Sequence, residues 1–402
     1  MRNHPAPPFR ALFPVFFYFL AGGIATVMLG PLLPALIQHW HIQDAQAGTL
    51  FTANFTGQFC GAWFATRNLR ASILYGSAVS AIGCAAMAWA SFGQAHIALF
   101  CVGLGLGAGL TAGNVVAGTA VPSSRARLIA LLNVSWGLGA IACPILVRIS
   151  SNGNLSGIRH FFLATAIFLI ATSLVSITIP QSRKPQRIVD AKVILPLSRT
   201  KGEELLSTVQ PSPRWPLPPL PLFIFGAAIF LYVGVENSLG GWLPSYAVRT
   251  NPSLHASSIS VYFWMAELIG RVLVTALMAL AGEVALYRIC LTLLILAEAA
   301  LCATAHISAG GVIALTVLGA LSLAPLYPLI MSFLLARTGN HAKLGALFAI
   351  ASFGGATLPW LTGVFSTRFH GLRAGLLVPA IGAALLLFLS TVLTTKPATA
   401  LK

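Results

Sequence analysis

The sequence predicts an all-α membrane protein with twelve transmembrane helices, arranged as two six-helix bundles. Two features of the composition indicate this class: 57% of the 402 residues are hydrophobic and only 8% are charged. A soluble domain carries about 25% charged residues, so this chain could not cover its surface in water. Disordered proteins are excluded by the opposite argument, because they require low hydrophobicity.

The third observation is that the apolar residues fall into continuous runs of spanning length. A transmembrane helix needs about 20 mostly apolar residues, whereas the strands of a membrane barrel alternate between apolar and polar residues. The first run is too long for the apolar core of a signal peptide and is counted as a helix. The twelve runs cover approximately residues 11–37, 45–66, 71–90, 95–121, 128–149, 160–180, 218–248, 256–281, 285–306, 308–336, 344–367 and 372–394.

One long polar stretch, rich in Pro, Lys and Arg, divides these runs six and six. We therefore expect an N-terminal bundle at 1–180, a linker at 181–217 and a C-terminal bundle at 218–402. Such a composition is typical of a flexible or partly helical connection.

The basic residues predict the orientation of the chain. A net charge of +16 would suggest nucleic acid for a soluble protein, but membrane proteins concentrate Lys and Arg in cytoplasmic loops. With the N-terminus inside, 18 of the 24 Lys and Arg are cytoplasmic, five are outside and Arg271 lies within a span. We expect a monomeric multi-pass protein of the bacterial inner membrane, with both termini and the linker cytoplasmic and with no nucleic-acid partner.

The two halves of the sequence repeat each other. The pattern L-G-x-x-L-P occurs at 29–34 and again at 239–244, and a second match relates the runs 128–149 and 344–367 at a similar offset. Two six-helix halves related by an axis along the membrane normal, with the substrate near the midplane between them, are the architecture of the major facilitator superfamily.

No pattern in the sequence indicates catalysis or a bound metal. The six cysteines lie in apolar runs without a C-x-x-C, and the histidines show no ligand spacing. The glycines that alternate from Gly103 to Gly109 indicate close helix packing, not a nucleotide site. We therefore expect no enzyme activity, no cofactor and no metal.

Several motifs resemble the fucose–galactose–glucose–proton symporter group of the major facilitator superfamily. They are 230–236 with Trp242 and 246–248, Thr111-Ala112-Gly113-Asn114, Leu132-Asn133, and 352–355 with Leu358-Pro359-Trp360. The resemblance covers nearly the whole chain and implies alternating-access transport. It also implies that Asn114 and Asn133 contact the substrate.

The chain departs from the group at its acidic positions. The group carries an acid in the first helix where this chain has Gly30, and a glutamate before T-A-A-N where it has Leu110. The acid of the superfamily signature between the second and third helices is also missing from 61–67. Proton coupling, where present, is therefore expected in the second half.

Four of the eight acidic residues lie in that half. Glu236 is mid-helix and is expected to bind substrate or to carry a proton, although a buried glutamate bonded to a neighbouring helix is the alternative. Glu267 and Arg271 are four residues apart, which favours an ion pair with either a structural or a coupling role. Glu283 and Arg288 are expected to form a latch between helix ends, and Asp44 to cap its helix.

The other polar side chains within the spans suit a neutral polyhydroxylated ligand, because amides both donate and accept hydrogen bonds. We expect a midplane cavity in which two first-half asparagines face three second-half residues, with an aromatic wall for stacking. Asn54 and Gln58 are expected only to join helices. The expected binding set is Asn114, Asn133, Trp136, Tyr232, Glu236 and Asn237.

The sequence thus predicts a secondary transporter for a sugar or a similar small neutral solute, with protons as an expected second substrate. Three alternatives stay open. They are an exporter of drugs or metabolites, a uniporter, and a transporter-like sensor that binds ligand without moving it.

Overall fold

The computed structural model describes residues 12–65, 68–120, 125–151, 155–178, 219–304, 306–338 and 344–394. The predicted linker at 181–217 lies outside these residues. All regular secondary structure within them is helical, which confirms the all-α prediction. The helices that precede the linker are α1 (Phe13–Val27), α2 (Leu29–Trp40), α3 (Asp44–Phe64), α4 (Leu69–Met87), α5 (Phe92–Ala120), α6 (Arg125–Ser151) and α7 (Leu155–Ser176).

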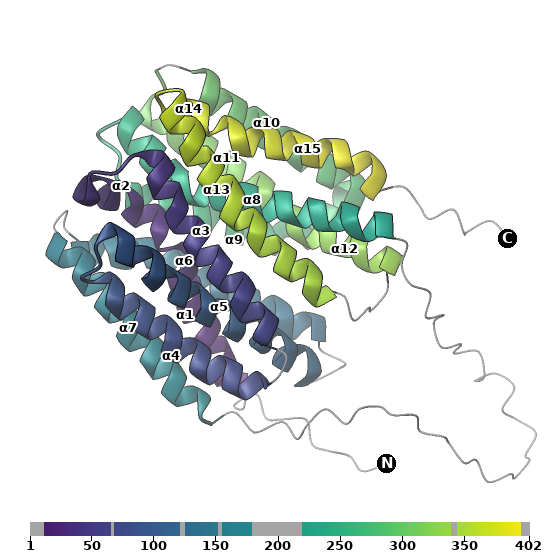
Figure 1. The fold of residues 1–402 in the computed structure, drawn as a ribbon. Coiled ribbons are helices and arrows are strands. Elements are labelled where there is room, and N and C mark those ends of the chain that lie inside the picture. The colour runs from purple at the N-terminus through teal and green to yellow at the C-terminus, as the bar shows by residue number, and fades with distance from the viewer. Residues whose placement is uncertain are drawn as a thin grey trace, which may run out of the picture.

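The remaining helices follow the linker and form a second bundle beside the first (Figure 1). They are α8 (Pro219–Thr250), α9 (Ala256–Ala281), α10 (Glu283–Ala303), α11 (Ala309–Leu323), α12 (Leu326–Thr338), α13 (Leu344–Arg368), α14 (Leu372–Gly375) and α15 (Leu377–Leu393). We call the face at which α7 ends and α8 begins the linker face, and the opposite one the far face.

Within the described ranges, ten helical segments are long and apolar enough to cross a membrane. Helices α3 and α13 have spanning length, 21 and 25 residues, but are not among those ten. These two helices pack against each other between the bundles. With them, the described helices are compatible with the twelve spanning segments that the sequence predicts.

Besides the predicted helix 372–394, which is divided into α14 and α15 at Leu376, two predicted helices are interrupted where proline removes a backbone donor. The first is divided between α1 and α2 at Met28, because Pro31 has no N–H to donate to Val27, the last residue of α1. The other is divided between α11 and α12 at Ala324 and Pro325. Such breaks change the direction of a helix near the middle of the bundle.

The alternating glycines of α5 do allow close packing, as the sequence predicts. A Cβ atom at Gly103 would lie 1.8 Å from the backbone oxygen of Asn54 on α3, and one at Gly105 would lie 2.0 Å from that of Gly76 on α4. Only glycine permits backbones to approach so closely. Helix α5 is therefore clamped between α3 and α4 in the first bundle.

Candidate transport site

The two bundles are joined at the far face by an ion pair between Asp44 and Arg249. The Arg249 guanidinium donates to both carboxylate oxygens of Asp44 at 2.7 Å each, and the Ser366 hydroxyl donates to Oδ2 at 2.6 Å. Asp44 begins α3, whereas Arg249 and Ser366 lie near the ends of α8 and α13. A bidentate pair fixes geometry as well as adding energy. We call these three residues the far-face latch.

The latch corrects one expectation. Asp44 is the first residue of α3 and pairs across the bundles, while Gln43 takes the capping position. The partners are 205 residues apart in the chain, and no local sequence pattern signals such a pair.

Further contacts between the bundles continue from the latch towards the middle of the molecule. The Thr52 hydroxyl on α3 donates to the backbone oxygen of Ala356 on α13 at 3.0 Å. Closer to the linker face, two turns along α3 and one turn along α13, the rings of Phe59 and Phe353 lie 4.5 Å apart. The contacts between α3 and α13 therefore extend from the far face at least to the level of this ring pair.

The two copies of the repeated L-G-x-x-L-P motif meet between the bundles. A Cβ atom at Gly30 would lie 2.4 Å from the carbonyl oxygen of Gly240. Any side chain at Gly30 would therefore push α2 away from α8 in this conformation. This contact gives a physical reason for the missing acid in the first helix, because the closed arrangement has no room for it.

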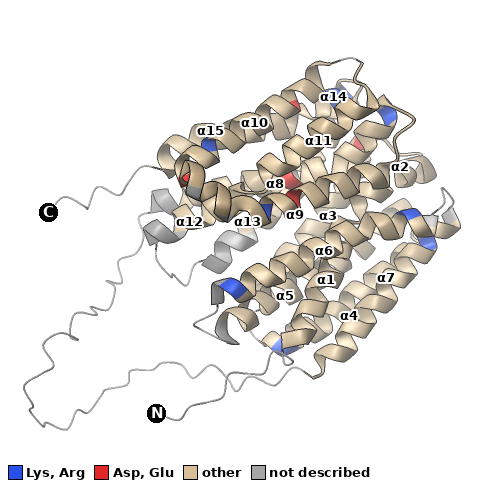
Figure 2. Ribbon diagram, turned by 180° about the vertical axis from the view of Figure 1, so that it is seen from behind, with Lys and Arg blue, Asp and Glu red and all other residues tan. Residues whose placement is uncertain are grey.

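Four residues of α8 and α9 form a buried cluster of polar and charged groups. Arg271 Nη2 donates to Glu236 Oε1 at 2.6 Å and to Glu267 Oε1 at 2.5 Å. The Tyr232 hydroxyl donates to the same oxygen of Glu236 at 2.7 Å. Figure 2 shows acidic and basic positions of α8 and α9 close together near the middle of these two helices. We call Tyr232, Glu236, Glu267 and Arg271 the charge cluster.

The charge cluster contains two carboxyl groups but one guanidinium. With both carboxylates ionised it carries one excess negative charge, in surroundings where an uncompensated charge is costly. Uptake of a single proton makes it neutral. The side chains of Glu267, Glu236 and Arg271 are 2%, 11% and 21% exposed, so Arg271 lies on the accessible side of the cluster. The arrangement is suited to binding and releasing one proton.

Trp136 brings the first bundle to this cluster. The guanidinium carbon of Arg271 lies 5.7 Å from the centre of the Trp136 ring, which is a cation–π geometry. The same ring meets Trp264 of α9 edge to face at 5.6 Å. Of the first-half residues in the predicted binding set, Trp136 is the one that the structure places against Arg271.

The three predicted asparagines do not contact the charge cluster. Asn114, Asn133 and Asn237 each donate to a backbone oxygen four residues earlier in their own helix, at 3.1, 3.1 and 2.8 Å. Asn114 and Asn133 are exposed and lie on the linker-face halves of α5 and α6. Their side chains are therefore not covered by other parts of the described chain.

Two further aromatic residues, Tyr327 and Trp264, lie near the charge cluster, and no sequence pattern predicts this position for them. The Tyr327 ring on α12 lies 5.5 Å from the Tyr232 ring. Trp264 contacts both Trp136 and Phe263. An aromatic residue in an apolar run is normally a packing residue, so only its position beside the cluster distinguishes these two.

The predicted latch between Glu283 and Arg288 is wrong. Glu283 accepts a hydrogen bond from the Ser332 hydroxyl of α12 at 3.0 Å, and Arg288 donates to the Thr394 hydroxyl at 3.2 Å. Both residues lie on α10, five positions apart, which places them about 140° apart around the helix axis. They cannot meet each other, although each connects α10 to a neighbouring segment.

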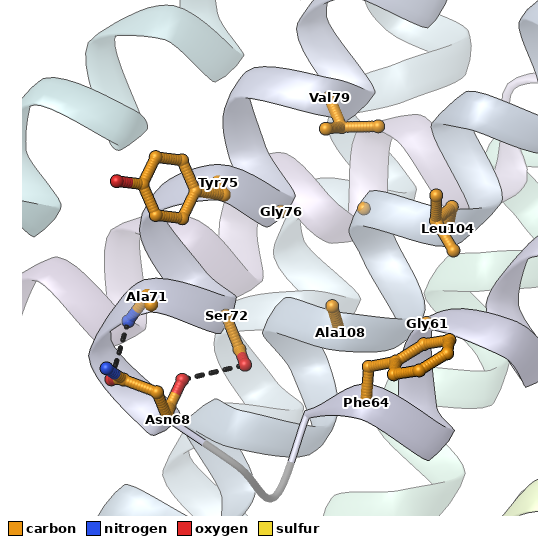
Figure 3. Close-up of a pocket in the computed structure, with 11 residues that line it drawn as sticks. Gly61, Phe64, Asn68, Ala71, Ser72, Tyr75, Gly76, Val79, Leu104 and Ala108 are labelled. Carbon is orange, nitrogen blue, oxygen red and sulfur yellow. Dashed lines mark hydrogen bonds between the residues drawn. The ribbon is translucent and has the colours of Figure 1, made fainter.

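Grooves on the outer surface of the first bundle lie apart from this region. One lies between α3, α4 and α5 (Figure 3), and its lining is mostly apolar or glycine. Two polar side chains in that groove are bonded locally: Asn68 Oδ1 accepts from the backbone N–H of Ala71, and the Ser72 hydroxyl donates to the Asn68 carbonyl. Among the described residues, no group of three or more His, Cys, Asp or Glu could hold a metal.

We expect replacement of Asn133 by Ala to weaken solute binding by roughly ten- to a hundred-fold. The reason is that a polar group of the ligand left without its partner costs about 1–3 kcal/mol. Folding should survive, because the exposed Asn133 side chain contributes little core packing. Calorimetric titration with D-glucose measures the change, and Glu298→Gln in α10 is the control. Equal affinity in both variants would remove Asn133 from the binding set.

Two helical bundles that are closed at one face and enclose a buried charge cluster define a polytopic membrane transporter. The profile of the Major Facilitator Superfamily matches residues 15–344, and this chain belongs to that family. Its members are transporters and not enzymes.

Individual relatives agree with this assignment. The chain is 25% identical over 360 residues to a glucose/mannose transporter of Bacillus subtilis, covering 86% of this chain and 85% of that one. It is 23% identical over 402 residues to a glucose/galactose transporter of Brucella abortus, covering 92% and 90%. The crystal structure of a D-xylose–proton symporter has the same fold, with a TM-score of 0.71 at 14% identity and coverage of 95% and 97%.

Proposed function

We propose that this protein transports a sugar together with protons by alternating access. The observation that carries the proposal is the charge cluster, which contains one carboxyl group more than its guanidinium can balance. Its position against Trp136 of the first bundle means that movement between the bundles would change its surroundings. The relatives named as glucose, galactose and mannose transporters support a hexose as the solute.

The conformation supports access from the linker face. The far-face latch closes the opposite side, and the contacts between α3 and α13 extend from it at least to the level of the Phe59 and Phe353 rings. Asn114 and Asn133 are exposed on the linker-face halves of α5 and α6. During transport, opening of the far face would require the latch and the Gly30–Gly240 contact to separate.

The charge cluster argues against an exporter of amphipathic cations. Such an exporter needs a carboxylate that is free to pair with its ligand. Here Glu236 already pairs with Arg271 and accepts from Tyr232. A cationic ligand would also meet the positive charge of Arg271 at the accessible side of the cluster.

Uptake of radiolabelled D-glucose, D-galactose and D-mannose into proteoliposomes tests the proposal. An imposed pH gradient should drive accumulation of at least one of these sugars above its external concentration. Equilibration without accumulation would indicate a uniporter, and binding without uptake would indicate a sensor. Failure to bind or move any of the three sugars would refute the sugar assignment.

We expect both termini and residues 181–217 to be cytoplasmic, in a bacterial inner membrane. The excess of Lys and Arg on these segments motivates the orientation. A Ser207→Cys variant in a cysteine-free background should be labelled by a membrane-impermeant maleimide only after the cells are opened. Labelling of that site from outside intact cells would reverse the predicted topology.

A further inference from the structure

Helix α3 carries two amide side chains that the sequence predicts only to join helices. Asn54 is 1% exposed, yet neither its side-chain nitrogen nor its side-chain oxygen has a hydrogen-bond partner. The side-chain nitrogen of Gln58, one turn further towards the linker face, is also buried and unpaired. The two amides therefore make no interhelical bond through these atoms among the described residues.

Packing places Asn54 against α5, close to α3 residues that contact the second bundle. On one side, its backbone and side-chain oxygens lie against Gly103 of α5. On the other, the Phe51 ring lies against Gly241 of α8 and the Phe55 ring against Gly355 of α13. Asn54 thus packs against α5 within the first bundle, while Phe51 and Phe55, three residues before it and one after, contact the second bundle.

Gln58 packs against α5 in the same way, one turn along the helix. Its backbone oxygen lies against Gly107 of α5, as that of Asn54 lies against Gly103. Gly103, Gly107 and Asn114 are spaced by four and seven residues, which places all three on one face of α5. The α3 segment that carries Asn54 and Gln58 therefore packs against the face of α5 on which the exposed Asn114 lies, about two turns beyond Gly107.

Buried amides without partners are uncommon in folded proteins, because each unpaired group loses its hydrogen bonds to water and gains none in return. A bound ligand that supplies the missing bonds removes that penalty. Hydroxyl groups suit both amides, since a hydroxyl donates and accepts, as an amide does. The side chains of residues four apart project from the helix about 6 Å apart along its axis, so two hydroxyls of one ring could reach both.

We propose that Asn54 and Gln58 form a recognition site on α3 for the hydroxyl groups of the transported solute. The inference rests on the proposed sugar transport and adds α3 to the elements that select the solute. In the present conformation Asn54 lies one turn deeper than Gln58 and is covered. It would meet a hydroxyl when the bundles rearrange around the solute.

Stability and affinity measured together test this inference. Asn54→Leu keeps the approximate size of the side chain but removes its polar atoms, so the sugar-free protein should melt at the same temperature or higher. Binding of D-glucose by calorimetry should weaken at least tenfold. Gln58→Met allows the same comparison of melting temperature and D-glucose affinity at the second amide. If Asn54→Leu fails to fold, the result for Gln58→Met tests the proposal by itself.

Thr316→Val is the matched control. Thr316 on α11 is also fully buried with an unpaired hydroxyl, and its removal should leave D-glucose affinity unchanged. Wild-type affinity in both Asn54→Leu and Gln58→Met would overturn the inference and indicate buried water at these amides. Equal weakening in Thr316→Val would overturn it as well, because the effect would then be general. Wild-type protein that binds none of the three hexoses would instead refute the proposed function itself, and with it this site.

Discussion

Replacement of Glu236 by Gln should abolish pH-driven accumulation of sugar while sugar binding persists. Glutamine keeps the shape of the side chain and can still bond to Tyr232 and Arg271, but it cannot release a proton. The remaining pair of Glu267 and Arg271 is then balanced in charge, so the cluster no longer has a proton to exchange. Uptake should fall to equilibration, that is, to equal sugar concentrations on both sides of the membrane.

The measurement is D-glucose uptake into proteoliposomes with and without a pH gradient, beside sugar counterflow at equal pH. Counterflow should remain, because it needs binding and movement but no net proton transfer. Glu298→Gln is the control, since Glu298 is also buried, on α10, but belongs to no ion pair among the described residues. A Glu236→Gln protein that still concentrates sugar in response to pH would exclude Glu236 as the coupling residue. The same uptake and counterflow measurements on Glu267→Gln would then test whether Glu267 is the coupling residue.

Removal of the Arg249 side chain should shift the protein towards opening at the far face. Arg249→Met leaves Asp44 with Ser366 as its remaining side-chain partner. Hydrogen bonds to charged groups contribute about 1.5–3 kcal/mol. Because the Arg249 side chain is 41% exposed, the lower end of that range is expected, which corresponds to roughly a tenfold change in the ratio of the two states.

Cysteine accessibility reports this shift. Gly241, Ser245 and Arg249 are four residues apart on α8, and the outer two contact α3, so Ser245 lies on the same stripe and is fully buried. In a cysteine-free background, Ser245→Cys should react about tenfold faster with a maleimide when Arg249→Met is added.

Arg159→Gln, which removes an exposed basic charge near the same face, provides the control and should leave the reaction rate unchanged. An unchanged rate in Arg249→Met would mean that the ion pair does not hold the far face closed. Arg249→Met should also transport sugar faster than Arg159→Gln, because each transport cycle must open the far face.

The charge cluster shows where sequence reasoning succeeded and where it stopped. The four-residue spacing of Glu267 and Arg271 predicts their pairing, since such residues are neighbours on a helix. The position of Glu236 within a span predicts that it has a partner, either a ligand or a neighbouring helix. That its partner is Arg271 of the next helix depends on how α8 and α9 pack, and local spacing does not carry that information. The same spacing argument excludes Glu283 and Arg288 as a pair.

The sequence by itself determined the class, the number of spanning segments and the repeat, because lipid imposes length and apolarity on every span and the backbone must satisfy its own hydrogen bonds. Only the tertiary structure decided which residues meet across the bundles. Asp44 and Arg249 are brought together by the closure of the far face, Gly30 and Gly240 by the contact of α2 with α8, and Trp136 by the packing of α6 on α9. Each contact joins distant parts of the chain, and its position follows from the packing of whole helices and not from any local pattern.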